Sequence, residues 1–256
     1  MLSKIINFLK THWIIFSITL LAAILRFVEI GGMPPSLNWD EVSHGYNAYS
    51  ILKTGKDEWG FTIPSIFRAY GDYKLPVYIY LTALSEFFFG LNAFAVRLSS
   101  VLAGIGTVIF TYLLVKELFK NRQLAIISSL LVSIEPWSLF VSRGAFEANL
   151  ALFFIVSGVY FFLRGLHTSY FLLLTSLFLG LSVWTYNSAR IFVPLLMFVI
   201  FLIYKKDLLT IFKKNKKLTA CYLLLTAFFF VPMFYQLLNP VGQARYGEVA
   251  IIDEGA

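Results

Sequence analysis

The sequence contains few charged residues and only one cysteine. Charged side chains make up 14% of its 256 residues, whereas a soluble globular domain carries roughly 25%. Because Cys221 is the only cysteine, no disulfide forms within the chain. The three histidines are far apart in the sequence, so we expect no dedicated zinc site. The sequence also lacks a phosphate-binding glycine loop and the nucleophile motif of serine hydrolases, which argues against the enzyme classes that depend on them.

Hydrophobic residues make up most of what is present. They form 59% of the chain, and the mean hydropathy is +0.76, so one water-soluble core could not bury this much apolar surface. A helix needs roughly 20 apolar residues to cross a bilayer. We therefore predict an all-α polytopic membrane protein with about seven transmembrane helices. The candidate spans are residues 13–30, 94–115, 124–140, 149–163, 170–185, 191–204 and 218–235.

Lysine and arginine concentrate in some of the loops between these runs. Cytoplasmic loops are enriched in both residues, and the richest loop here is 205–217, "KKDLLTIFKKNKK". The apolar run 75–90 decides the topology, because it is short, contains Glu86 and would reverse every later loop if it crossed. Placing it at the membrane surface as a juxtamembrane helix keeps 205–217 cytoplasmic. The N-terminus is then cytoplasmic, and residues 31–93 form one large external loop of a plasma-membrane protein.

Polar residues expected on the external side gather near the ends of the predicted helices. An acidic pair, Asp40 and Glu41, directly follows the first span, and partial desolvation beside Trp39 would make Asp40 a better base. Carboxylates and cations brought together on one membrane face suit a reaction with an anionic, membrane-anchored substrate. The other members of this group are Tyr46, Asp57, Glu58, Asp72, Lys74, Arg143, Glu147, Asn187 and Arg190.

Each of these residues also has an ordinary structural explanation. Acids in external loops are usually solvated, a lysine at a membrane surface often snorkels, and arginines anchor helix ends. Charges inside the apolar runs have similar explanations. Arg26 and Glu29 are three positions apart, which favours a local ion pair. Glu135, directly before Pro136, either faces a cavity or marks the end of a helix.

Four stretches of the chain carry a resemblance to a known family. They are "WDEVSHGYNAYSILKTGKDEWG", "GDYKLPVYIY", "FGLNAFAVRLSS" and "SRGAFEANLALFF". In this order they resemble membrane glycosyltransferases of the GT-C fold, namely bacterial members of the dolichyl-phosphate-mannose–protein mannosyltransferase family and the aminoarabinose transferases that modify lipid A. The resemblance extends over nearly the whole chain. It implies a sugar donor linked to polyprenyl phosphate and an acceptor that is a protein, a lipid or a glycan.

The resemblance also implies roles for individual residues. In the family, an acidic residue of the first external loop activates the acceptor, and it matches Asp40, with Glu41 completing the pair. In the aminoarabinose transferases a lysine helps to hold the lipid phosphate, and it matches Lys74 in "YKLP". Arg143 and Arg190 are the alternative cations for the phosphate.

These features together predict an inverting glycosyltransferase with its active site on the external face. The donor phosphate leaves readily without a general acid, so one carboxylate base and cations on the phosphate are sufficient for a single displacement. The sequence indicates no cofactor with certainty, and it leaves open whether a divalent metal takes part. Nucleic acid is not an expected partner, because the basic residues lie in short loops between apolar runs.

Two other functional classes and the completeness of the chain stay open at this point. A transporter or flippase of lipid-linked sugars would place its charges near the bilayer midplane and show repeated halves. A non-catalytic membrane scaffold would need no acids and cations on one face. Relatives have further helices, so we expect 1–256 to be one transmembrane domain from the N-terminal part of a longer chain. Alone, it should insert in membranes but turn over poorly.

Overall fold

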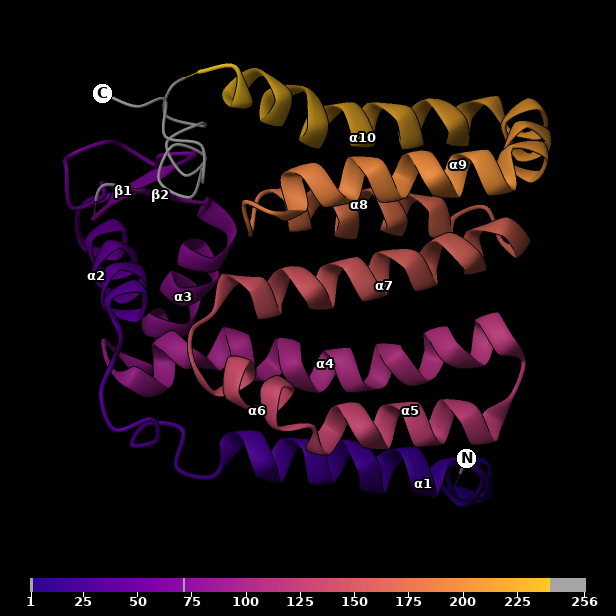
Figure 1. The fold of residues 1–256 in the computed structure, drawn as a ribbon, viewed down its shortest axis with the longest axis horizontal. Coiled ribbons are helices and arrows are strands. Elements are labelled where there is room, and N and C mark those ends of the chain that lie inside the picture. Colours follow the sequence, from indigo (N-terminus) through magenta and orange to yellow (C-terminus); the bar gives the residue numbers. More distant parts are fainter. Residues whose placement is uncertain (1, 71, 240–256) are drawn as a thin grey trace, which may run out of the picture.

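The structure is a computed structural model, and it describes residues 2–70 and 72–239 of the chain. Most of the described helices run side by side as a bundle, whereas two further helices and a small hairpin gather at one end of it (Figure 1). The bundle comprises α1 (Leu2–Phe27), α4 (Ala93–Phe119), α5 (Arg122–Ile134), α7 (Glu147–His167), α8 (Phe171–Val183), α9 (Ala189–Lys214) and α10 (Lys216–Leu237). The set at the end comprises α2 (Trp39–Thr54), β1 (Phe67–Ala69), β2 (Asp72–Lys74) and α3 (Pro76–Phe89), while α6 (Pro136–Arg143) connects α5 to α7.

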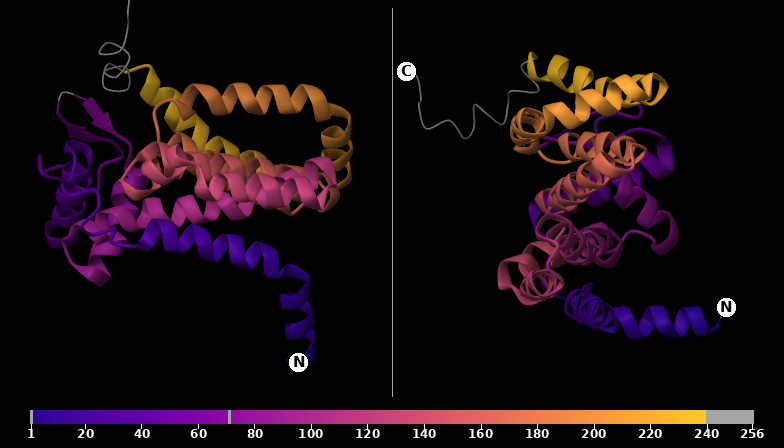
Figure 2. Two further views of the ribbon diagram at one scale, coloured as in Figure 1. Left: turned by 60° about the horizontal axis from the view of Figure 1, so that its bottom comes forward. Right: turned by 90° about the vertical axis from the view of Figure 1, so that its right-hand side faces the viewer.

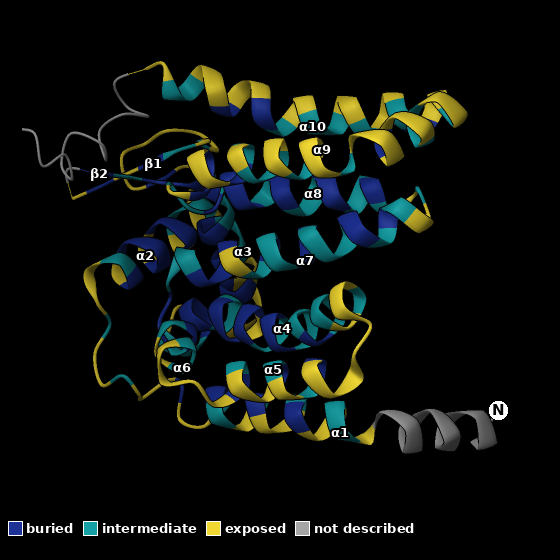
Figure 3. Ribbon diagram, turned by 45° about the vertical axis from the view of Figure 1, so that its right-hand side comes forward, coloured by how far each residue is buried: buried dark blue, intermediate teal, exposed yellow. Residues whose placement is uncertain are grey.

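The interior of the bundle lies around α4, α7 and α8. Much of their surface is buried, while α9 and α10 expose large parts of theirs (Figure 3). One apolar cluster, with Tyr78, Val96 and Phe154, joins α3, α4 and α7. A second, with Leu179 and Met233, joins α8 to α10. In the right-hand view of Figure 2, α1 and α10 lie at opposite edges of the bundle. Both helices expose apolar side chains, which suits a lipid environment.

Local sequence signals fix the ends of the elements at the crowded end of the bundle. Asn38 and Glu41 form a reciprocal capping box at the start of α2, with hydrogen bonds of 2.8 and 2.9 Å. Gly55 ends α2 with a φ of +71°, a left-handed conformation that favours glycine. Pro76 begins α3 directly after the strand that ends at Lys74. These signals hold the first turn of α2 and the end of β2 in defined positions.

The connections between the helices of the bundle alternate between its two ends. The segments after α1, between α6 and α7, and between α8 and α9 lie at the end that carries α2 and α3 (Figure 1). The connections between α4 and α5, α7 and α8, and α9 and α10 lie at the opposite end (Figure 1). This is the alternation that the apolar runs predict, with the polar candidate residues at one end.

The apolar run 75–90 forms a separate helix, as the sequence predicts. It becomes α3, Pro76–Phe89, which packs against α2 and α4 at the end of the bundle. At fourteen residues it is shorter than the roughly 20 that a span needs. Its position at a membrane surface stays a prediction.

The predicted number of about seven transmembrane helices is not confirmed. Within the described part of the chain, three helices are long and apolar enough to cross a membrane by length and composition, namely α4, α7 and α10, or four if α5 and α6 count as one span. The apolar stretches Trp13–Phe27 and Phe171–Val183 are shorter. The predicted span 191–204 is part of α9, which continues to Lys214 and is interrupted by non-helical torsion angles at Tyr204.

The predicted span 124–140 consists of two helices, α5 and α6, rather than one straight helix. The chain bends by 55° between α5 and α6, because Pro136 has no N–H group with which to continue the helix. The carboxylate of Glu135 instead accepts hydrogen bonds from the backbone N–H groups of Trp137, at 2.9 Å, and Ser138, at 2.6 Å. Glu135 therefore marks a helix boundary, and it also lines a cavity between α4, α5, α6 and α7, so both predicted roles are found.

Arg26 of α1 binds the carbonyl groups that this break leaves free. Its guanidinium donates to the carbonyl oxygens of Ser133 at 3.0 Å and Val132 at 3.2 Å, and its side chain is fully buried. Glu29 lies beyond the end of α1, with a φ of +52°. The predicted ion pair between Arg26 and Glu29 does not form among the described residues, because the donors of Arg26 serve the α5 backbone.

Candidate functional site

A polar cavity of about 420 Å³ lies where α2, β2, the start of α7 and the α8–α9 connection meet. These segments come together at the end of the bundle that carries α2 and α3 (Figure 1). Five residues singled out in the sequence line the cavity, namely Asp40, Asp72, Lys74, Glu147 and Asn187. The other lining residues are His44, Ala145, Phe146, Ala148, Tyr186 and Ser188.

An ion pair between Asp40 and Lys74 connects α2 to β2 inside this cavity. The Lys74 ammonium lies 2.8 Å from Asp40 Oδ1, and the exposed fractions of the two side chains are 9% and 49% for lysine and aspartate. The cation is therefore held in place, while the half-exposed Asp40 carboxylate still reaches solvent. Burial alone would lower the pKa of Lys74. The negative charges of Glu147, Asp40 and Asp72 outweigh this effect, so the pKa is raised above its usual value. Lys74 remains protonated at neutral pH.

Glu41 points away from this cavity into the protein interior, although it is next to Asp40 in the sequence. Its side chain is 2% exposed and lies 2.7 Å from Nε of Arg97, which is fully buried. Glu41 also accepts a hydrogen bond from the Ala145 N–H at 3.0 Å and caps α2 through Asn38. The acidic pair is thus divided between one carboxylate at the cavity and one that holds α2, α4 and the α6–α7 connection together.

His44 joins the cavity through Glu147, a contact that the sequence analysis did not anticipate. His44 Nε2 lies 3.2 Å from Glu147 Oε1, and its ring packs against Tyr78 with the ring centres 4.9 Å apart. His44 is four residues after Asp40 on the same helix, and residues at that spacing share a helix face. That spacing was the signal that could have identified it. Tyr186, next to Asn187, was also missed, because no motif or spacing distinguishes it in the sequence.

Arg143 and Arg190 do not line the cavity. Arg143 donates to the carbonyl oxygens of Leu25 and Val28, each at 2.8 Å, and so anchors the segment after α1. Arg190 is 2% exposed, donates to Gln236 Oε1 and lies over the Trp184 ring. Both arginines therefore have the structural role of holding helix ends.

Three other candidate residues also lie outside the cavity. Tyr46 is exposed on α2. Asp57 is buried and accepts hydrogen bonds from the N–H groups of Trp59 and Phe61, at 3.0 and 2.8 Å, so it organises a turn. Glu58 accepts a hydrogen bond from the Asn47 amide at 2.9 Å. The long segment between α2 and α3 therefore uses its acids largely to fold itself.

The cavity carries more negative than positive charge. Among the residues described, its lining includes three carboxylates, from Asp40, Asp72 and Glu147, and one cation, Lys74. A carboxylate that reaches solvent next to a fixed ammonium can accept a proton beside a group that binds an anion. Within residues 2–70 and 72–239, no three His, Cys, Asp or Glu side chains are placed to hold a metal ion.

Comparisons with known proteins place the chain in a family. The model of the family described as dolichyl-phosphate-mannose-protein mannosyltransferase matches residues 16–239. Among curated proteins, none matches the sequence significantly.

Solved structures of membrane enzymes share the fold. ArnT from Cupriavidus metallidurans bound to undecaprenyl phosphate matches with a TM-score of 0.67 and 17% identity, over 94% of this chain and 43% of that chain. Its apo state gives 0.68 and 16%, over 96% and 46%. The oligosaccharyltransferase AglB from Archaeoglobus fulgidus, in complex with an inhibitory peptide and a dolichol-phosphate, gives 0.64 and 17%, over 88% and 30%.

The chain spans less than half the length of each of these structures. At such low identities the structural likeness establishes the shared fold, and the family model carries the assignment. Because that model covers most of the chain, the protein is a multi-pass membrane protein and belongs to the dolichyl-phosphate-mannose–protein mannosyltransferase family.

Proposed function

We propose that the protein transfers a sugar from a polyprenyl-phosphate donor to an acceptor hydroxyl, with inversion, and that Asp40 is the general base. The observation that carries this proposal is the contact between Asp40 and Lys74 in a cavity at one end of the helical bundle. Membership of the family supports sugar transfer. Matched structures that hold undecaprenyl phosphate or dolichol-phosphate support a lipid phosphate as the donor carrier.

The proposed reaction is a single displacement at the anomeric carbon. The acceptor oxygen forms a bond to this carbon while the bond from the carbon to the donor phosphate oxygen breaks. Asp40 accepts the acceptor proton, and the electron pair of the broken bond leaves with the lipid phosphate. The ammonium of Lys74 balances the charge that develops on this phosphate. No general acid is needed, because the leaving group is a stabilised anion.

The ion pair suggests how donor binding and base activation are linked. The Lys74 ammonium is 2.8 Å from Asp40 Oδ1, so a donor phosphate at Lys74 must compete with the Asp40 carboxylate. When the phosphate takes over the lysine, Asp40 loses its counter-ion and becomes available to the acceptor hydroxyl. The base is then free mainly when the donor is in place, which limits unproductive proton transfer.

The other polar groups at the cavity divide into two proposed sets. Asp72, Glu147, Asn187, His44 and Tyr186 line the space around the ion pair and are placed to contact the sugar or the acceptor. Of the remaining candidates, Glu41, Asp57 and Arg190 support the fold through buried contacts. We propose that the cavity faces the outside of the cell and the N-terminus the cytoplasm, as the charge distribution of the loops predicts.

The test is Asp40→Asn in native membranes supplied with polyprenyl-phosphate mannose or polyprenyl-phosphate glucose. Release of polyprenyl phosphate should fall roughly 10²–10⁴-fold, the usual contribution of a positioned general base. Binding of polyprenyl phosphate to the purified variant should be retained or strengthened by up to about fivefold, because a competing carboxylate is removed. Asp207→Asn, which removes an exposed acid at the far end of α9, is the matched control.

Other outcomes separate the rival explanations. Normal turnover in Asp40→Asn would show that another group accepts the proton. Movement of the labelled donor across sealed vesicles without release of polyprenyl phosphate would indicate a transporter or flippase. Absence of both activities together with no binding of polyprenyl phosphate would leave a non-catalytic scaffold.

A further inference from the structure

A second cavity adjoins the candidate site along the helices. It also measures about 420 Å³ and is lined by α4, α5, α6 and α7. Ala148, in the first turn of α7, lines both cavities. The charged cavity and this second one, which we call the α6–α7 groove, are therefore neighbours that share a wall.

The α6–α7 groove is apolar and opens to the side of the bundle. Leu131 and Leu152 face it and are 58% and 46% exposed. Two of its polar lining groups are engaged elsewhere: the Asn149 amide donates to the Ser100 carbonyl at 2.7 Å, and the Glu135 carboxylate caps α6. The groove therefore suits a hydrocarbon chain better than a polar ligand.

The bend between α5 and α6 forms one side of this groove. α6 diverges from the direction of α5 by 55°, and residues on both sides of the bend line the groove. Two features fix the bend, namely the Glu135 cap and the hydrogen bonds of Arg26 to the carbonyls of Val132 and Ser133. The groove is thus largely preformed, as binding sites usually are.

We infer that the α6–α7 groove holds the first isoprene units of the donor lipid while its phosphate lies at Lys74. This inference rests on the proposed function and adds to it the path of the lipid chain. The groove and the charged cavity match the two ends of such an amphiphile, an apolar chain and a single phosphate. The chain is already in hydrocarbon when it is in the bilayer, so the groove gains little hydrophobic free energy from it. Its contribution is to orient the phosphate toward Lys74 and Asp40.

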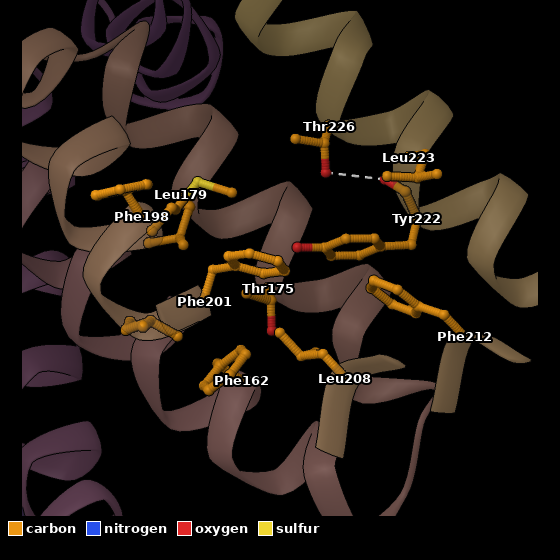
Figure 4. Close-up of a pocket in the computed structure, with 12 residues that line it drawn as sticks. Phe162, Thr175, Leu179, Phe198, Phe201, Leu208, Phe212, Tyr222, Leu223 and Thr226 are labelled. Atoms are coloured by element: carbon orange, nitrogen blue, oxygen red, sulfur yellow. Dashed lines mark hydrogen bonds between the residues drawn. The ribbon is translucent and has the colours of Figure 1, made fainter. Parts of the chain in front are cut away.

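The chain offers a matched control cavity. It measures about 370 Å³, lies between α7, α8, α9 and α10, and is also apolar (Figure 4). Phe162, Phe201 and Tyr222 surround it (Figure 4). None of its lining residues lines the charged cavity. A lipid chain that bound any apolar cavity would enter both.

The experiment uses farnesyl phosphate with a diazirine on its first isoprene unit, photolysed with the purified full chain in nanodiscs. Mass spectrometry should place the label on α6 and α7 around the groove, and excess polyprenyl phosphate should displace it. Leu152→Trp fills the groove and should reduce this labelling at least tenfold. Leu223→Trp, at a similarly exposed leucine of the control cavity, should not change it.

The outcomes distinguish the groove from the proposed function. The label could instead attach outside the groove, and still be displaced by polyprenyl phosphate and reduced by Lys74→Ala. That result would refute the inference about the groove and leave the proposal of a polyprenyl-phosphate donor intact. Labelling of the groove that farnesol or a phosphatidylcholine displaces as well as polyprenyl phosphate does would show a site for any membrane lipid and would also overturn the inference. No displacement by polyprenyl phosphate at any position would count against the proposed function itself.

Discussion

Replacing Glu41 by glutamine should damage the fold rather than the chemistry. The Glu41 carboxylate is 2% exposed and is the counter-charge of Arg97, whose side chain is fully buried. Removing one partner of a buried ion pair costs about 3–5 kcal/mol, because the other charge stays buried. Glutamine keeps an oxygen that can accept from the Ala145 N–H, so we expect a loss of about 2–4 kcal/mol.

The neighbouring aspartate provides the control for this prediction. Asp40 is half-exposed and its ion pair is reachable by solvent, so Asp40→Asn should change the free energy of unfolding by less than about 1 kcal/mol. A 3 kcal/mol loss in Glu41→Gln corresponds to a fall of roughly 6–12 °C in Tm for a chain of this size.

The assay is thermal unfolding of both purified variants in detergent, together with release of polyprenyl phosphate in membranes. We expect Glu41→Gln to lower Tm and to keep turnover per folded molecule. Asp40→Asn should leave Tm nearly unchanged and lose turnover. A Glu41→Gln protein with wild-type Tm and no turnover would refute the reasoning, because Glu41 would then act in the reaction.

Further expectations concern orientation, donor binding and pH. Cysteines placed at Lys56 and Lys214, in a chain without Cys221, should differ in intact cells: an impermeant thiol reagent should label only position 56, and the reverse would invert the topology. Lys74→Ala should weaken polyprenyl phosphate binding about ten- to hundredfold, because a charge-assisted contact is lost; unchanged affinity would contradict its role. Burial raises the pKa of Glu86 to about 7, so the folded state holds this proton more tightly than the unfolded chain. Stability should therefore fall by about 2–3 kcal/mol from pH 4.5 to about pH 8 in calorimetry. Glu86→Gln should remove this slope and exposed Glu29→Gln should not.

The apolar pattern predicts much of the fold because it depends on local composition. Helices form at all of the predicted runs, and the segment 75–90 is a separate helix as predicted. The pattern fails at Pro136, where a long apolar run continues through a 55° bend. A hydropathy pattern records only which residues are apolar. It does not show that proline removes a backbone hydrogen bond, or that Arg26, about 110 positions earlier, donates to the carbonyl groups left free.

The candidate site could be predicted only in part for a related reason. Asp40 and Lys74 lie in the segment between α1 and α4, and Glu147 begins α7, so the alternation of apolar runs places all three at the same end of the bundle. Which acid of the adjacent pair faces the cavity depends on Arg97, 56 residues after Glu41. A pairing over that distance leaves no mark on the local sequence.

The cations illustrate how contacts separate structural from functional charges. The segment after α1 is irregular, so its carbonyl groups need donors from within the protein wherever water is scarce. Arg97 donates to the carbonyls of Ile30, Pro34 and Ser36, and Arg143 serves neighbouring carbonyls in the same way.

A guanidinium has several fixed donors and can therefore bind two or three backbone carbonyl groups at once, whereas an ammonium acts as a compact point charge. In the described residues, the one close polar partner found for the Lys74 ammonium is a carboxylate that reaches solvent. An incoming phosphate can replace a single half-exposed carboxylate, but it could take over Arg97 or Arg143 only by freeing two or three backbone carbonyls at once. Each such carbonyl, if left buried without a partner, costs about 1–3 kcal/mol. The charges at the helix ends are therefore not equivalent, and Lys74 is the cation whose present contacts leave it available to an anionic substrate.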